Sequence, residues 1–129
     1  MFLKHLPMIF SSDPDKLVKF YTDVLEMKIL NEFKLPDDYG YKLQVSKNSE
    51  LFIGRHSEVR GKSKEHFRHM HTFYTDDVKG WYEKIKDNSE VEIICKPEPT
   101  PGTDEKNPRL VCTILDPEGN CLQFLGSKK

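Results

Sequence analysis

Two histidines stand two residues apart in the stretch FRHMHTF, where Met70 separates His69 from His71. Imidazole nitrogens bind transition metals, so such a pair is a natural starting point for a metal site. If the stretch is a β-strand, its side chains alternate between faces, and His69 and His71 share a face from which both could contact one ion. The same spacing is also typical of exposed or hydrogen-bonded histidines without a metal, so both interpretations stay open.

The other reactive side chains give weaker signals. Cys95, Cys112 and Cys121 form no CxxC pair. A Cys–His nucleophile is conceivable near the last strands, but nothing local marks an activated thiol. The seven glycines form neither a GxGxxG nor a GxxxxGK[ST] phosphate-binding loop. Cysteine catalysis and nucleotide binding are therefore disfavoured.

Composition restricts the class of partner. The 129 residues carry 20 basic and 21 acidic side chains, so no net field would draw the chain to nucleic acid or to an anionic membrane. We expect a small molecule or a second copy of the chain as partner. The odd number of cysteines argues against a disulfide framework and for a reducing compartment. The apolar start is too short for a signal-peptide core, and no apolar run reaches membrane-spanning length, so we expect a cytoplasmic protein.

The elements that must position these side chains occur twice in one order. Residues 2–10 are typical of a strand, and residues 11–27 of a helix that Asp13 caps, with Pro14 in its first turn. Strand-like runs follow at 39–45 and 49–54.

A shift of 64 residues gives the second copy. The elements that it predicts are a strand at 68–74, a helix at 75–88 capped by Asp76 or Asp77, and strands at 90–95, 109–115 and 121–126. The polar stretch 57–66 is typical of a linker. The proline-rich stretch 96–108 is typical of a loop that could form a lid or a cavity rim.

This order, with FYTDVLEMKIL early and DPEGNCLQF late, resembles that of the vicinal oxygen chelate superfamily of glyoxalases, bleomycin-resistance proteins and extradiol dioxygenases. The resemblance covers nearly the whole chain, and DPxGN followed by a strand is its most specific part. It implies an α+β fold of two βαβββ modules, about 1–56 and 67–126, within a single domain over 1–129. The modules would form an incomplete barrel around a cavity. Many members dimerise, so the resemblance also implies a homodimer.

In the metal-dependent members, His, Glu or Gln side chains from the first and last strands of each module hold a divalent ion. Gln123 stands where the family usually carries Glu after DPEGN, and Glu50 of SELFIG is the matching residue in the first module. A one-residue slip in register would turn Glu50 outward.

The first strands leave the metal question open. The family's ligand usually stands seven residues before the helix-capping Asp, which gives Leu6 and Met70, and both are poor ligands. His5 and His69 each precede these by one residue, so one shared shift, such as a bulge in each strand, would bring both inward. The apolar pattern favours different registers in the two halves.

Our favoured interpretation is a cavity that binds a small organic molecule without a metal or other cofactor. The expected pocket residues are Leu6, Met8, Phe10, Met70, Thr72, Tyr74 and Gln123. The alternative is a metal-dependent lyase, isomerase or dioxygenase acting on vicinal oxygens, with Ni, Zn, Mn or Fe held by His5, Glu50, His69 and Gln123. Glu50 would then be the catalytic base, because Gln123 cannot accept a proton. A structural dimer with a vestigial cavity is a third interpretation.

Overall fold

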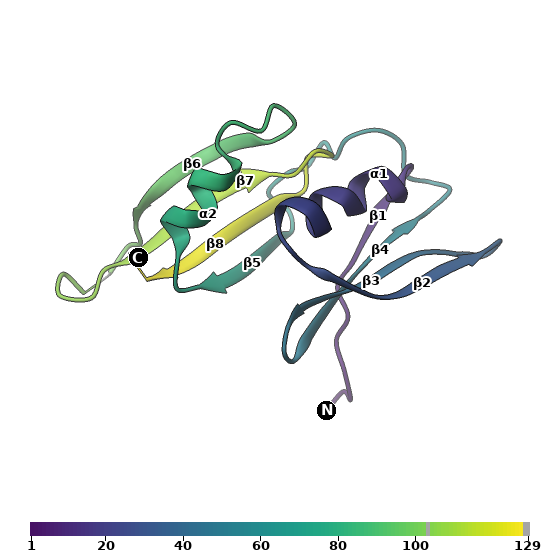
Figure 1. Cartoon of the computed structure of the whole chain (residues 1–129), viewed down its shortest axis with the longest axis horizontal. Coiled ribbons are helices and arrows are strands. Elements are labelled where there is room, and N and C mark those ends of the chain that lie inside the picture. Colours follow the sequence, from purple (N-terminus) through teal and green to yellow (C-terminus); the bar gives the residue numbers. More distant parts are fainter. Residues whose placement is uncertain (103, 128–129) are drawn as a thin grey trace. The chain divides into compact units, whose positions relative to one another are not determined.

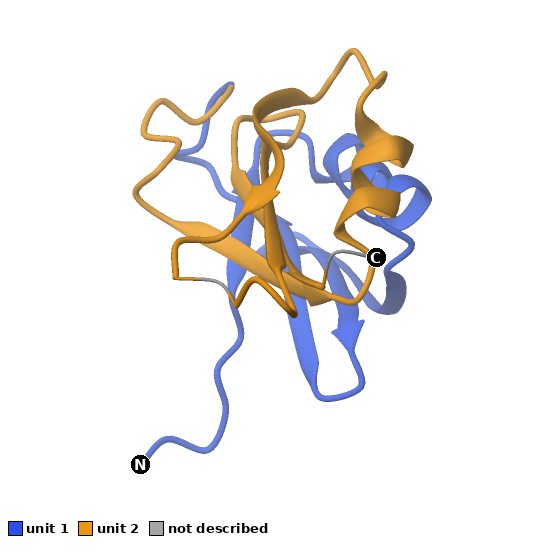
Figure 2. Ribbon diagram, turned by 90° about the vertical axis from the view of Figure 1, so that its left-hand side faces the viewer, with its two compact units in different colours: residues 1–61 blue, residues 62–129 orange. Residues whose placement is uncertain are grey.

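The computed structural model describes residues 1–102 and 104–127, and the chain divides into two compact units, 1–61 and 62–129 (Figure 2). Each unit is a βαβββ module with one four-stranded mixed sheet (Figure 1). The expected α+β fold of two such modules is therefore confirmed. Within the described ranges, no helix is both long and apolar enough to cross a membrane.

The elements of unit 1 are strand β1 (Met8–Ser11), helix α1 (Pro14–Lys19), the π-helical segment η1 (Phe20–Val24), and strands β2 (Lys28–Leu35), β3 (Asp38–Ser46) and β4 (Ser49–Arg55). The strands lie in the order β1-β4-β3-β2, in which β1 is parallel to β4 and the other pairs are antiparallel. Strand β2 is an edge strand, and all but one of its residues are exposed.

Helix α1 begins where the sequence predicts it. The Asp13 carboxylate accepts a hydrogen bond of 3.2 Å from the backbone N–H of Lys16. Pro14 occupies the first helical position, where the N–H that it lacks would have no partner within the helix. The helix packs against β1, β3 and β4, and the residues buried most completely at this contact include Leu17, Tyr21, Leu43 and Ile53.

The elements of unit 2 are β5 (Met70–Thr75), α2 (Val78–Ile85), β6 (Glu92–Pro99), β7 (Arg109–Leu115) and β8 (Cys121–Ser127). Their sheet has the order β5-β8-β7-β6, with β5 parallel to β8, so it repeats the topology of unit 1. Asp77, and not Asp76, caps α2 by accepting a hydrogen bond of 3.0 Å from the Gly80 N–H. The Trp81 ring of α2 stacks on Phe124 of β8, with centroids 5.9 Å apart.

Three predicted boundaries differ from the structure. The first strand starts at Met8 and not at residue 2, because Pro7 has no N–H to extend the ladder and only its carbonyl bonds to the Phe52 N–H. Strand β2 lacks the apolar alternation that would have marked it, since both of its faces are largely exposed. Residues 96–99 belong to β6, so the expected loop is shorter and runs from Thr100 to Pro108, with Thr103 outside the described residues.

Candidate functional site

The sheet of unit 1 has one face under helix α1 and one face free of it. Tyr41 of β3 is paired with Ile53 of β4, which is paired with Ile9 of β1. The Tyr41 hydroxyl donates to the Asp15 carboxylate of α1, so this row of residues faces the helix. Because strand side chains alternate, the neighbouring row lies on the other face. We call the helix-free side the open face of unit 1, and it carries Met8, Phe10, Lys42, Glu50 and Phe52.

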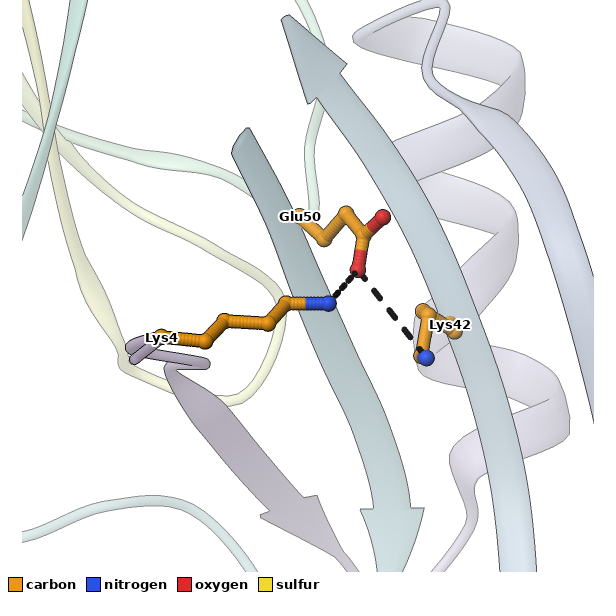
Figure 3. Close-up of polar contacts among 3 residues, drawn as sticks. All are labelled: Lys4, Lys42 and Glu50. Atoms are coloured by element: carbon orange, nitrogen blue, oxygen red, sulfur yellow. Dashed lines mark hydrogen bonds and ion pairs between the residues drawn. The ribbon is translucent and has the colours of Figure 1, made fainter. Parts of the chain in front are cut away.

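Glu50 on this face forms ion pairs with two lysines. Its carboxylate Oε1 lies 2.7 Å from Lys4 Nζ, in the segment before β1, and 3.9 Å from Lys42 Nζ of β3 (Figure 3). The hydrogen bond from Lys4 is the main cause that lowers the pKa of Glu50, and the charges of Lys4 and Lys42 add to it, while partial desolvation opposes it. Glu50 is therefore a weak base, and a divalent cation would have to displace ammonium groups to bind it.

Unit 2 has the same two-faced arrangement. Phe124 stacks on Trp81 of α2 and contacts its strand neighbour Phe73, so both phenylalanines face the helix. The alternate residues form the open face of unit 2, which carries Met70, Thr72, Tyr74, Gln123 and Leu125. The Thr72 hydroxyl donates to the Gln123 carbonyl oxygen at 3.2 Å across the β5–β8 pair. This bond fixes the Gln123 amide against the sheet.

The histidines that the sequence analysis grouped differ in their burial. His71 lies on the helix side of β5, since it alternates with Phe73, and it is half-buried. Burial is the main cause that lowers the pKa of His71, the Asp116 carboxylate opposes the shift, and His69 reinforces it. His69 and His5 are exposed and stand just outside their strands, at β5 and β1.

Strands β1 and β5 thus have the register that places Met8, Phe10 and Met70, and not the histidines, on the open faces. Met8 and Phe10 lie on that side in unit 1. Met70 takes the corresponding place in unit 2. Six of the seven expected pocket residues are strand residues on the open face of their unit, namely Met8, Phe10, Met70, Thr72, Tyr74 and Gln123. Leu6, His5 and His69 lie outside the strands.

The donor set implied by the resemblance does not fit a four-ligand metal centre. Each open face supplies one of the expected oxygen ligands, Glu50 or Gln123, and Glu50 is already paired with lysines. Among the residues described, no cluster of three or more His, Cys, Asp or Glu side chains is arranged to hold an ion. Thr72 already uses the Gln123 carbonyl oxygen.

Lys4 and Lys42 are site residues that the sequence analysis missed. In the run YGYKLQV, the apolar side chains of Tyr39, Tyr41 and Leu43 alternate with Gly40, Lys42 and Gln44. That alternation places Lys42 on the face opposite Tyr41 and was sufficient to find it. No comparable signal marks Lys4, which precedes the strand and reaches Glu50 across 46 residues of sequence.

The turn DPEGN, residues 116–120, fixes the start of β8. The buried Asp116 carboxylate accepts hydrogen bonds of 2.9 Å from the Glu118 and Asn120 N–H groups, and the Asn120 amide also donates to it. Gly119 adopts a φ of 82°, which favours glycine. His66 Nδ1 lies 2.8 Å from the Gly119 carbonyl oxygen, and the Ser63 N–H donates to the Glu118 carbonyl, so the segment before β5 packs on this turn.

Comparisons with known proteins agree with this architecture. The profile of the Glyoxalase/Bleomycin resistance protein/Dioxygenase superfamily matches residues 3–124. No curated protein is significantly similar to the sequence.

Similar solved structures include a member of that superfamily from Sphaerobacter thermophilus, with a TM-score of 0.75, 17% identity and 98% of both chains covered. A hypothetical protein from S. aureus has a TM-score of 0.75 and 16% identity, over 98% of this chain and 95% of that one. A mutant of glyoxalase I from Zea mays has a TM-score of 0.75 and 22% identity, over 94% of this chain but 44% of its own length. At these identities the likeness concerns the fold alone.

Proposed function

The chain belongs to the Glyoxalase/Bleomycin resistance protein/Dioxygenase superfamily, and from that premise we propose that it binds a small organic molecule on the open face of one of its units, without a four-ligand metal centre. The observation that carries the proposal is the pairing of Glu50 with Lys4 and Lys42. The one acidic side chain expected at a metal site is neutralised by cations from its own unit, so this face suits an organic ligand better than a divalent ion.

The remaining open-face side chains support a ligand with apolar surface. Met8 and Met70 are 48% and 43% exposed, which is unusual for side chains that a sheet could bury. Methionine is flexible and polarizable, and together with Phe10 it can adapt to an irregular or aromatic body. On unit 2, Gln123, held by Thr72, would orient a ligand bound there through its amide group. No step of this function needs a base at Glu50.

The test combines metal analysis with ligand binding. Metal-stripped protein is exposed to nickel, zinc, manganese and ferrous iron, dialysed, and analysed by plasma mass spectrometry beside Glu50→Gln, His5→Ala and His69→Ala. We expect less than about a tenth of an ion per chain under every condition. About one ion per chain, lost in all three variants, would overturn the proposal and favour the metal-dependent lyase, isomerase or dioxygenase.

Ligand binding is measured through the methyl groups of the methionines, of which the chain has four. Protein labelled with ¹³C in the methionine methyls is titrated with 2-naphthamide, a neutral aromatic probe, and followed by NMR. We expect the methyl signals of Met8, Met70 or both to shift, because these side chains lie on the open faces. Met27, which follows η1 and lies in neither sheet, is the internal control. Shifts confined to Met27, or none at all, would contradict open-face binding.

A further inference from the structure

Strand β2 is the last strand of the unit 1 sheet on the side away from β1 (Figure 1). One side of its backbone pairs with β3, and no strand of that sheet lies on its other side. All of its side chains except Phe33 are exposed, and Leu35 is 62% exposed. Alternate N–H and C=O groups of such an edge point outward and can pair with an added strand.

The corresponding edge strand of unit 2 has a different composition. Strand β6 carries Pro97 and Pro99 in its second half. Proline has no N–H to donate to an added strand, and prolines on a sheet edge are a common protection against pairing with other chains. Strand β2, with the sequence KILNEFKL, contains no proline. Of these two equivalent edges, β2 is therefore the one whose backbone can accept a further strand.

The regular part of β2 is Asn31–Leu35. The pairing of β2 with β3 is irregular between Ile29 and Asn31, and an irregularity of this kind bends a strand. From Asn31 onward, consecutive residues of β2 pair with consecutive residues of β3. An added strand would therefore pair with the segment that follows the irregularity.

The side chains of this segment place opposite charges on one face. Phe33 lies on the open face of unit 1, with its ring centroid 6.0 Å from that of Phe52. Lys34 lies on the helix side, where its Nζ is 5.8 Å from the centroid of the Tyr41 ring. Glu32 is the strand partner of Tyr41 and shares that face. A carboxylate and an ammonium group thus flank Phe33 on the same side of the sheet.

We propose that Asn31–Leu35 pairs in antiparallel fashion with the same segment of a second copy of this chain, with Phe33 opposite Phe33 on a twofold axis. In this register, Glu32 of each copy lies opposite Lys34 of the other copy, so the segment is complementary to itself in charge. A twofold axis at Glu32 or at Lys34 would instead place like charges opposite each other. The phenylalanine and leucine side chains of both copies would meet on the open-face side.

This interface is independent of ligand binding on an open face, and it is small. One strand pair of this length contributes far fewer residues than the roughly 20–30 on each side of a standard stable interface. We therefore expect a transient dimer with a dissociation constant on the order of 100 µM.

The experiment is sedimentation velocity on the full chain, over concentrations that span the expected dissociation constant. Glu32→Lys and Lys34→Glu each place like charges opposite each other in both cross-strand pairs. Each variant should weaken the dimer at least about ten-fold. An equimolar mixture of the two variants brings opposite charges together again in both pairs, so it should form a mixed dimer. Glu92→Lys, on the exposed part of β6, is the matched control and should leave the association unchanged.

The outcomes are distinct. A chain that stays monomeric at every concentration would overturn the proposal, and so would a dimer that neither charge reversal weakens. Loss of the dimer in both variants without recovery in their mixture would overturn the register with Phe33 on the axis. Circular dichroism identifies a variant that unfolds. If Lys34→Glu does not fold, because Lys34 also contacts Tyr41, an unchanged dimer in Glu32→Lys is sufficient to overturn the proposal.

Discussion

Lys4 Nζ and Glu50 Oε1 lie 2.7 Å apart, and this contact joins the segment before β1 to strand β4. The pair places a positive charge beside the carboxylate that the sequence analysis named as a candidate metal ligand. The Lys4 side chain is 59% exposed and that of Glu50 is 28% exposed, so the pair lies at the edge of the open face of unit 1 and adds little to stability. Its main effect is to lower the pKa of Glu50.

Lys4→Met should raise the pKa of Glu50 toward its ordinary value, because the Lys4 hydrogen bond is the main cause of its lowering. NMR titration that follows the side-chain carboxyl carbon of Glu50 measures this pKa. Lys42→Met should have a smaller effect, since Lys42 Nζ is 3.9 Å away. A pKa that is unchanged in both variants would contradict the pairing. Because the folded-state pKa is the lower one, the stabilising effect of the pair is present above the unfolded pKa and is lost as the pH falls.

His71 should make unit 2 less stable in mild acid. Burial lowers its pKa in the folded protein, so protonation favours the unfolded chain. The free energy of unfolding should fall as the pH drops through the unfolded value of about 6.5 and level off below the folded pKa. Urea unfolding at pH 7.5 and 5.5 measures this, and His71→Gln should show a smaller decrease. His5→Gln, which changes an exposed histidine outside the strands, is the matched control variant. An unchanged slope in His71→Gln would show that His71 is not the titrating group.

Tyr41→Phe should destabilise unit 1 by about 1–2 kcal/mol, because it removes a hydrogen bond to the Asp15 carboxylate and keeps the ring. Tyr39→Phe removes the second bond to that carboxylate, of 2.6 Å, and should cost less than about 1 kcal/mol, since Tyr39 is more exposed than Tyr41. Lys34 lies 5.8 Å from both ring centroids, and phenylalanine preserves these contacts. Thermal unfolding of both variants tests which substitution costs more stability. A larger loss of stability in Tyr39→Phe than in Tyr41→Phe would contradict the prediction.

The three thiols should differ in reactivity. Burial raises the pKa of Cys112 to about 11, so about one thousandth of it is thiolate at pH 8. Burial also raises the pKa of Cys121 and of Cys95, but Cys121 is buried whereas Cys95 is only half-buried and can be reached by a reagent. Native protein treated with iodoacetamide should first be modified at Cys95, as peptide mass spectrometry will show, and urea should make all three reactive. Early modification of Cys112 would instead indicate an activated thiol and would support the hypothesis of a cysteine nucleophile.

The sequence predicted the parts of the fold that local chemistry determines. Asp13 and Asp77 cap the two helices because each supplies a side-chain acceptor at a helix start, and they stand 64 residues apart. Strand β7 was predicted over its observed length, since a run of apolar residues between polar turns is a strong signal. Strand β2 gave no signal because an exposed edge strand needs no apolar alternation.

The register of β1 and β5 could not be read from the pattern, since both faces of each strand carry apolar residues. Contacts with the helices decide it. In unit 1, Tyr41 donates to Asp15 of α1 and lies in one row with Ile53 and Ile9. In unit 2, Trp81 stacks on Phe124 beside Phe73. These contacts join residues of different elements, so the alternation within one strand does not reveal them. The Lys4–Glu50 pair was missed for the same reason.

The attachment of Ser63 and His66 to the DPEGN turn also determines where the chain would accept foreign sequence. Gly61 is exposed, has a φ of 64°, and would meet no neighbour if it carried a Cβ. Two residues later the backbone is bonded to Glu118. A peptide tag or a reporter domain spliced in directly after Gly61 should therefore leave both modules folded. The same insertion between Ser63 and His66 would separate two anchors of one turn and detach the segment that leads into β5.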